Sequence, residues 1–176
     1  KIGNVTKREF NSIGLTGCLN FYKVNFKETI IIGSGGKCED NINIVNSTGI
    51  IDSISSYDSF SDAVDIDFSD IKINYIESHK ANNDCLDVSY GEYIIDNLEL
   101  IDCGDKGLSV GEKSKFFGNF VLIKNVEVGI ASKDSSYTFI KNFEGIGMDY
   151  CANAYKKKQE FNGGILDIER LQCSYS

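Results

Sequence analysis

The feature that most constrains this chain is a repeat of 22 residues. An alternating apolar–polar stretch that begins at Val64 recurs at Leu86, Leu108 and Ile130, and a looser fifth copy begins near Ala154. Alternation is the pattern of β-strands, and the turn formers Asn, Asp, Gly and Ser separate the stretches. A strand–turn unit of this length coils into a solenoid whose coils stack by main-chain hydrogen bonds about 4.8 Å apart. The repeat therefore predicts an all-β fold, a parallel β-helix.

The repeat also sets the domain organisation. It is strict over residues 60–153, and we expect residues 1–176 to form a single domain of about six to seven coils. Looser apolar stretches predict two further coils in the first third of the chain, at residues 19–21, 30–32 and 42–45. No amphipathic helix precedes Ile13, and residues 173–176 stop in mid-pattern. We therefore expect a segment of a longer chain, with end-to-end packing or homo-oligomers through uncapped coils.

The later part of each copy keeps the same period. Apolar residues recur at Ile73, Ile95, Phe117 and Phe139, and asparagines recur at positions 97 and 119, with a third one place late at 142. Stacked asparagines in equivalent turns predict a ladder of hydrogen bonds along the solenoid axis, a structural role. Leucine-rich repeats have a similar length, but their consensus is absent, and an antiparallel sandwich has no reason to keep a fixed period.

Charge and cysteine content limit the class of protein. The net charge of −8 argues against nucleic acid as a partner, because neutralising phosphates requires a basic surface. Residues 1–104 carry 8 basic and 17 acidic residues, whereas residues 105–176 carry 10 and 9. No run of about 18 apolar residues exists, so no membrane span is expected. The six cysteines form no C-x-x-C pair and favour buried free thiols, with disulfides as the alternative for an exported chain.

Four successive stretches resemble a known family. They are residues 83–87 (NDCLD), 104–114 (GDKGLSVGEKS), 129–136 (GIASKDSS) and 154–160 (AYKKKQE). Over residues 60–165 the chain resembles right-handed β-helix proteins of the pectin-lyase-like superfamily, and in particular a bacterial subgroup with DKGxSxGE and GIAxKDxS in consecutive coils. The subgroup often occurs in surface or envelope proteins. The superfamily holds polysaccharide lyases, hydrolases and epimerases as well as adhesins and inert scaffolds, so the resemblance implies the fold and leaves the activity open.

The repeat places acidic side chains side by side. Apolar residues of each stretch point inward and their neighbours outward, so Asp65 and Asp87 lie one coil apart, at about 5 Å. Together with Asp67 and Glu112 they predict an oxygen-rich patch suited to Ca²⁺, which takes about six to eight hard ligands. The alternative is that these carboxylates only solvate an outer face.

The resemblance to β-helix lyases implies a set of catalytic residues. In such lyases Ca²⁺ neutralises a uronate carboxylate and a basic side chain removes the α-proton. By analogy Lys133 is the candidate base, acting with Asp87, and Lys106 or Tyr155 is an auxiliary. A hydrolase would instead use two of the three aspartates at positions 65, 67 and 87 as its carboxylate pair.

Two function classes follow from these features. The first is a carbohydrate-active or carbohydrate-binding module for an acidic polysaccharide, with Tyr90, Glu112, Tyr155 and Lys157 in contact with substrate. Tyrosines at 90, 93, 137 and 155 are expected to line one long shallow groove. The second is a noncatalytic solenoid of a surface, fibre or assembly protein. An extracellular or cell-envelope location is favoured for both, and His79 is expected in a surface turn.

Overall fold

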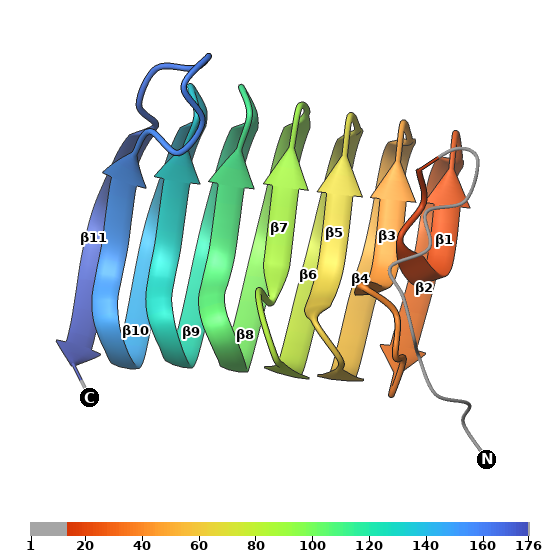
Figure 1. Ribbon diagram of the computed structural model, residues 1–176, viewed down its shortest axis with the longest axis horizontal. Helices are drawn as coiled ribbons and strands as arrows, with labels where there is room; N and C mark the ends of the chain where they lie inside the picture. Colours follow the sequence, from red (N-terminus) through yellow and green to blue (C-terminus); the bar gives the residue numbers. More distant parts are fainter. Residues whose placement is uncertain (1–13, 176) are drawn as a thin grey trace.

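The structure is a computed structural model that describes residues 14–175, and it shows a parallel β-solenoid of about six turns (Figure 1). All the regular secondary structure in this range is β-strand. The strands are β1 (Gly17–Tyr22), β2 (Asn25–Ser34), β3 (Asp40–Val45), β4 (Thr48–Ser59), β5 (Asp62–Asp67), β6 (Asp70–Ala81), β7 (Leu86–Ser89), β8 (Glu92–Gly111), β9 (Lys115–Lys133), β10 (Tyr137–Tyr155) and β11 (Ile165–Tyr175).

Each strand pairs in parallel with the equivalent strand of the next coil. One row runs β1-β3-β5-β7 and the other runs β2-β4-β6, and both continue into the long strand β8. The strands β8, β9 and β10 each extend through most of a coil, and β11 pairs with the first part of β10. The register Val64–Leu86–Leu108–Ile130 repeats every 22 residues, and the next partner is Ala152. The predicted β-helix is confirmed, and the fifth copy starts two residues earlier than expected.

Inward apolar side chains fill the core, and left-handed residues turn the chain at the corners. Val64, Leu86, Leu108 and Ile130 are fully buried, as the alternation predicts. Two columns of positive-φ residues mark two corners of the coil: Asn46, Phe68, Tyr90, Glu112 and Asp134 in one, and Asp58, Lys80, Asp102, Asn125 and Gly147 in the other. Positive φ is uncommon for side chains other than Gly, Asn and Asp, so the stacking of coils imposes it on Phe68, Tyr90 and Lys80.

One extra residue shifts the second half of the repeat. Gly118, not Phe117, pairs with Ile95, so the predicted alignment of Phe117 is wrong by one position. The turn between β8 and β9, residues 112–114, holds one residue more than the preceding turn, and the shift is absorbed between Cys103 and Lys106. A strict period read from sequence cannot detect an insertion that is compensated within the same coil.

The same shift changes the asparagine column. Asn97 pairs with Phe120, and Phe120 pairs with Asn142, so Asn119 rather than Asn142 is out of step. The expected structural role along the axis is nonetheless observed, since Asn142 Nδ2 donates to the carbonyl oxygen of Asn119 at 3.1 Å and Asn97 Nδ2 to that of Asn74 at 3.4 Å. These asparagines bond to main-chain oxygens instead of forming a side-chain ladder.

All six cysteines form disulfides, so the prediction of free thiols is wrong. The pairs are Cys18–Cys38, Cys85–Cys103 and Cys151–Cys173. Cysteines 18 to 22 residues apart meet because the chain turns between them, and the Cα atoms of Cys85 and Cys103 are 5.7 Å apart. The first pair joins β1 to the start of the next coil and the last joins β10 to β11. Two of the three disulfides therefore fasten the first and last coils of the described range.

Two expectations about the chain remain to be placed. The absence of a capping helix before Ile13 concerns residues outside the described range. Within residues 14–175, no helix is long and apolar enough to cross a membrane, in agreement with the expected lack of a membrane span.

Candidate functional site

Most of the predicted site residues lie on one side of the solenoid, here called the polar face, and Tyr90, Glu112 and Lys157 lie at the corner beside it. It consists of β3, β5, β7 and residues 106–111, 128–133 and 150–155 of the next three strands. Part of it is unexpectedly closed, since Ser109 is fully buried and Lys133 nearly so, whereas Asp65, Asp67 and Asp87 are half-buried. The reason is that these polar side chains pair with one another along the axis.

Lys133 shows how this closure works. Its side chain lies along the outer surface of Gly111, where an added Cβ would stand 3.0 Å from Lys133 Cε. The ammonium Nζ donates to Ser109 Oγ at 2.6 Å and lies 3.8 Å from Asp87 Oδ1. The structure thus brings together the predicted base and its predicted partner Asp87. The lysine itself fills the space above the glycine, and only 5% of its side chain is exposed.

The predicted calcium ligands have separate partners. Asp65 accepts a hydrogen bond from Asn43 Nδ2 at 3.0 Å, Asp67 accepts one from Ser89, and Glu112 forms an ion pair with Lys158. In the part of the chain that the structure describes, no group of three or more His, Cys, Asp or Glu side chains is arranged to hold a metal ion. Calcium binding by these four side chains stays a prediction.

A neighbouring column of aspartates joins successive coils. Asp62 Oδ1 accepts the backbone N–H of Asp84 at 2.9 Å, and Asp84 Oδ1 accepts that of Lys106 at 3.1 Å. The ammonium group of Lys106 pairs with Asp84 and Asp105. Lys106, predicted as a catalytic auxiliary, is therefore engaged in holding the coils together.

Burial of these carboxylates raises their pKa values. Desolvation is the main cause for each, and it raises the pKa of Asp84 and of Asp87 to about 6 and that of Asp40 to about 7. The pKa of Asp65 lies well above its ordinary value for the same reason, reinforced by Asp67. Perturbed carboxylates mark functional sites in many proteins, but structural polar networks perturb them too. Here Asp40 and Asp84 lie in the column of Asp62, and Asp65 and Asp87 lie in a second column whose side chains also pair from coil to coil.

An insertion interrupts the repeat next to the polar face. Tyr137 pairs with Ile165, 28 residues further on, so this coil is six residues longer than the standard 22. The extra residues form the insertion loop, residues 156–164, which projects beyond the strand ends between β10 and β11 (Figure 1). The buried Asp134 Oδ1 holds the loop by accepting the backbone N–H groups of Lys157 and Lys158 at 2.7 and 2.8 Å. The loop is therefore fixed to the corner.

Aromatic side chains stack beside this loop. The rings of Phe68 and Tyr90 lie parallel with their centroids 4.7 Å apart, and Phe161 of the loop meets Tyr90 edge-on at 6.4 Å. Lys113 Nζ lies 5.9 Å from the Phe161 ring centroid. A recess of ≈ 260 Å³ adjoins them, lined by Asp70, Tyr90, Gly91, Glu92, Lys113 and Lys115. We call the stack and the insertion loop together the basic corner.

Of the five lysines in and beside the basic corner, two are paired with a glutamate and three are not, among the residues that the structure describes. Lys158 pairs with Glu112, and Lys115 lies 3.8 Å from Glu92. Lys113, Lys156 and Lys157 are exposed, and within residues 14–175 none has a carboxylate oxygen within 4.0 Å of its ammonium nitrogen. The corner thus presents unpaired positive charge on a chain whose net charge is −8.

The tyrosines do not line one groove as predicted. Tyr93 is fully buried, with its hydroxyl donating to the carbonyl oxygens of Ile66 and Ser89 at 2.9 and 2.7 Å. Tyr137 packs against Phe117 on another side of the coil, and Tyr155 ends the Lys133 column, half-buried. Only Tyr90 contributes to the basic corner.

Some residues escaped the sequence prediction or were placed wrongly. Phe68 was recoverable, because it precedes Tyr90 by one period of 22. Phe161 was signalled only by the departure of its segment from the repeat. His79 lies in β6, not in a turn, with its ring stacked 5.7 Å from that of Tyr57.

Comparisons with known proteins give no match. No family model matches the chain, and no curated protein or solved structure is significantly similar to it.

Proposed function

We propose that this solenoid is a binding module for an acidic polysaccharide, and that the basic corner makes the contact. The observation that carries the proposal is the insertion loop, which departs from the repeat and presents Lys156 and Lys157 unpaired. Insertions in solenoid repeats commonly form the binding face, because they add side chains without disturbing the stacked coils. Exposed lysines attract carboxylate or sulfate groups, and the neighbouring aromatic rings offer apolar surface for sugar rings.

The arrangement supports binding over catalysis. A general base must reach the proton that it removes, yet the ammonium group of Lys133 is buried and donates to Ser109. Asp87 is joined to the same network. A lyase or epimerase built on Lys133 would require this pair to open, whereas the exposed lysines of the insertion loop need no rearrangement to meet a polyanion.

Family and location form part of the proposal. The parallel coils of 22 residues, with DKGLSVGE and GIASKDSS in consecutive coils, support membership in the pectin-lyase-like superfamily. Three disulfides support an oxidising compartment, as expected for an extracellular or cell-envelope protein.

The test is binding to immobilised polygalacturonate, alginate and a sulfated glycan at low and high salt, with and without calcium. We expect binding that weakens with salt, and at least a tenfold loss in the double variant Lys156→Gln/Lys157→Gln. Lys72→Gln/Lys141→Gln, on another side of the solenoid, is the matched control and should bind normally. Absorbance at the wavelength of unsaturated uronates, followed in parallel, should stay flat.

Three results would change this account. Unsaturated products that disappear in Lys133→Ala would establish a lyase. Binding that survives the double variant would place the contact elsewhere. No binding by the folded protein to any of the polyanions would favour the second candidate, a noncatalytic structural solenoid. That candidate is supported by the polar face, where charged side chains such as Lys133 and Asp87 pair with one another between coils.

A further inference from the structure

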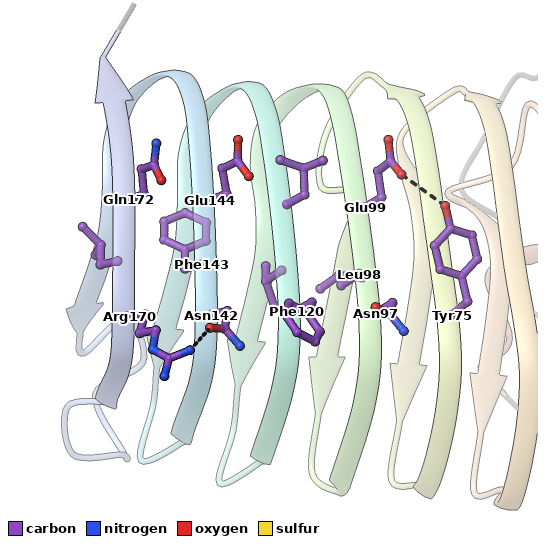
Figure 2. Close-up of a pocket in the computed structure, with 13 residues that line it drawn as sticks. Tyr75, Asn97, Leu98, Glu99, Phe120, Asn142, Phe143, Glu144, Arg170 and Gln172 are labelled. Atoms are coloured by element: carbon purple, nitrogen blue, oxygen red, sulfur yellow. Dashed lines mark hydrogen bonds between the residues drawn. The ribbon is translucent and has the colours of Figure 1, made fainter.

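A different side of the solenoid carries an open groove. We call it the groove face, and it consists of residues 75–79 of β6, 97–101 of β8, 120–124 of β9, 142–146 of β10 and 170–174 of β11. A shallow cavity of ≈ 540 Å³ runs along it, across five coils. Figure 2 shows its outward side chains in two rows that follow the solenoid axis: Tyr75, Asn97, Phe120, Asn142 and Arg170 in one, with Glu99, Glu144 and Gln172 in the other.

At its centre the groove has the same polar pair on two coils, with an apolar coil between them. In the first row Asn97 pairs with Phe120 and Phe120 with Asn142. In the second row Leu122 stands between Glu99 and Glu144 in the same way. An amide and a carboxylate thus flank an apolar coil on both sides, and 54% of the Phe120 ring is exposed. Two coils span about 9.5 Å, so polar pairs recur at that interval.

The interval discriminates between extended polymers. Two residues of an extended peptide advance about 6.7 Å, which falls out of step with the groove after one repeat. In an extended β-1,4-linked hexose chain, successive rings face alternately, so equivalent edges recur every second sugar at a spacing close to two coils. The apolar coil would then meet the C–H face of one ring, while the polar coils meet the hydroxyl and amide groups of its neighbours.

The charge of the groove decides which glycan fits. Among the residues that line the cavity, Glu99 and Glu144 are acidic and Arg170 is basic, and Glu77 and Lys124 lie on the groove face beside it. Arg170 Nη1 donates to Asn142 Oδ1 at 3.3 Å. Burial and the two neighbouring glutamates raise the pKa of Tyr75 to about 12, so its hydroxyl stays a donor, 3.2 Å from Glu99 Oε2. Uronate carboxylates would meet like charge here, whereas uncharged sugar hydroxyls find acceptors.

We infer that the groove face binds an extended, uncharged β-1,4-linked hexose polymer, with Phe120 as the central stacking residue. The inference is independent of the proposed function, because it involves another side of the coil and a ligand of different charge. Asn97 with Glu99 and Asn142 with Glu144 contact alternate sugars on either side of the ring that Phe120 supports.

The test is titration of the full chain with β-1,4-linked hexamers of glucose, of N-acetylglucosamine and of the acidic sugar mannuronate. Binding isotherms and backbone amide NMR shifts report the result. We expect one of the two uncharged hexamers to bind and to shift amides in residues 97–99, 120–122 and 142–144. Phe120→Ala should weaken binding about tenfold. Tyr150→Ala, which removes a ring of similar exposure (56%) from another side, is the matched control and should bind within twofold of the parent.

A second variant tests the role of charge. Glu99→Gln/Glu144→Gln keeps one acceptor oxygen at each position and removes the repulsion, so it should retain the uncharged hexamer and newly admit the acidic one to the groove. The inference is overturned if neither uncharged hexamer binds, if Phe120→Ala binds as tightly as the parent, or if the amide shifts lie outside the groove face. Loss of polyanion binding in the insertion-loop variant, with groove binding intact, would separate the two sites.

Discussion

The polar face and the groove face are built from the same repeat, but they satisfy their outward polar groups differently. On the polar face, side chains bond to partners one coil away, as in the Lys133–Ser109–Asp87 row, and the result is buried. On the groove face, Phe120 and Glu144 stay exposed. A glycine explains much of the difference, because Gly111 lets Lys133 lie flat over the sheet. On the groove face Asn142 and Tyr75 also bond across coils, so the feature that sets this face apart is the exposed Phe120, which remains available to a ligand.

The largest expected difference between the two faces is in their response to pH. Asp84 has a folded-state pKa of about 6, above its unfolded value near 3.9, so the folded state binds more protons between these values. Stability is therefore greatest near the lower value and falls as pH rises through the higher one. We expect the free energy of unfolding to fall by about 2.4 kcal/mol for this group alone between pH 4 and pH 7.5, measured by urea denaturation.

A pair of matched variants isolates that effect. Asp84→Asn keeps the acceptor for the Lys106 N–H and should make the pH profile shallower by the share of this one group, since Asp40 and Asp87 still titrate. Asp70→Asn alters an exposed aspartate that also accepts a backbone N–H, that of Glu92 at 3.0 Å, and should leave the profile unchanged. Equal profiles for Asp84→Asn and the parent would contradict the account.

Removing the buried cation should have the next largest effect. Lys133→Ala leaves Asp87 without its cation, and we expect a loss of about 2–3 kcal/mol, below the full value for a buried pair because 30% of the Asp87 side chain is exposed. Thermal and urea unfolding at pH 7 measure it. Lys141→Ala, an exposed lysine on β10, should change stability by less than about 0.5 kcal/mol. Similar losses for both lysines would remove the distinction between the faces.

Gly111→Ala tests the packing of Lys133 over the sheet and should have a smaller effect on stability than Lys133→Ala. The new methyl group would press on Lys133 Cε, and we expect a cost of about 1–2 kcal/mol. In the Lys133→Ala background that cost should nearly vanish, because nothing then lies over the glycine. A cost that stays the same in both backgrounds would show that the glycine is needed for another reason.

The smallest stability effect is expected on the groove face. Phe120→Ala removes a ring that is 54% exposed, so the free energy of unfolding should change by less than about 0.5 kcal/mol while glycan binding weakens. A loss of more than about 2 kcal/mol would place Phe120 among the structural side chains.

The repeat predicted the fold because every coil must match the next in hydrogen-bond register. Val64, Leu86, Leu108 and Ile130 face inward as expected, since strand alternation leaves them no other choice. Outward directions were also correct for Asp87 and the other polar-face columns. The sequence could not show which side chain covers an outward residue. The long side chain of Lys133 reaches over Gly111 and covers the predicted site.

The groove escaped prediction for a different reason. Its first row is in register only after the extra residue in the turn at 112–114, so Asn97, Phe120 and Asn142 do not fall on one period of 22. The disulfides were missed because the spacing of Cys85 and Cys103 gives no sign that the chain turns back between them. Both failures concern contacts set by the path of the coil and not by local pattern.

The central claim is that ligands meet the basic corner and the groove face while the polar face serves the fold. Hydrogen–deuterium exchange of the full chain, with and without a bound acidic polysaccharide and then a bound uncharged hexamer, tests it most directly. The account predicts added protection in residues 156–164 for the first ligand and in residues 97–99, 120–122 and 142–144 for the second. Protection confined to residues 65–67, 87–89 and 131–133 would contradict it.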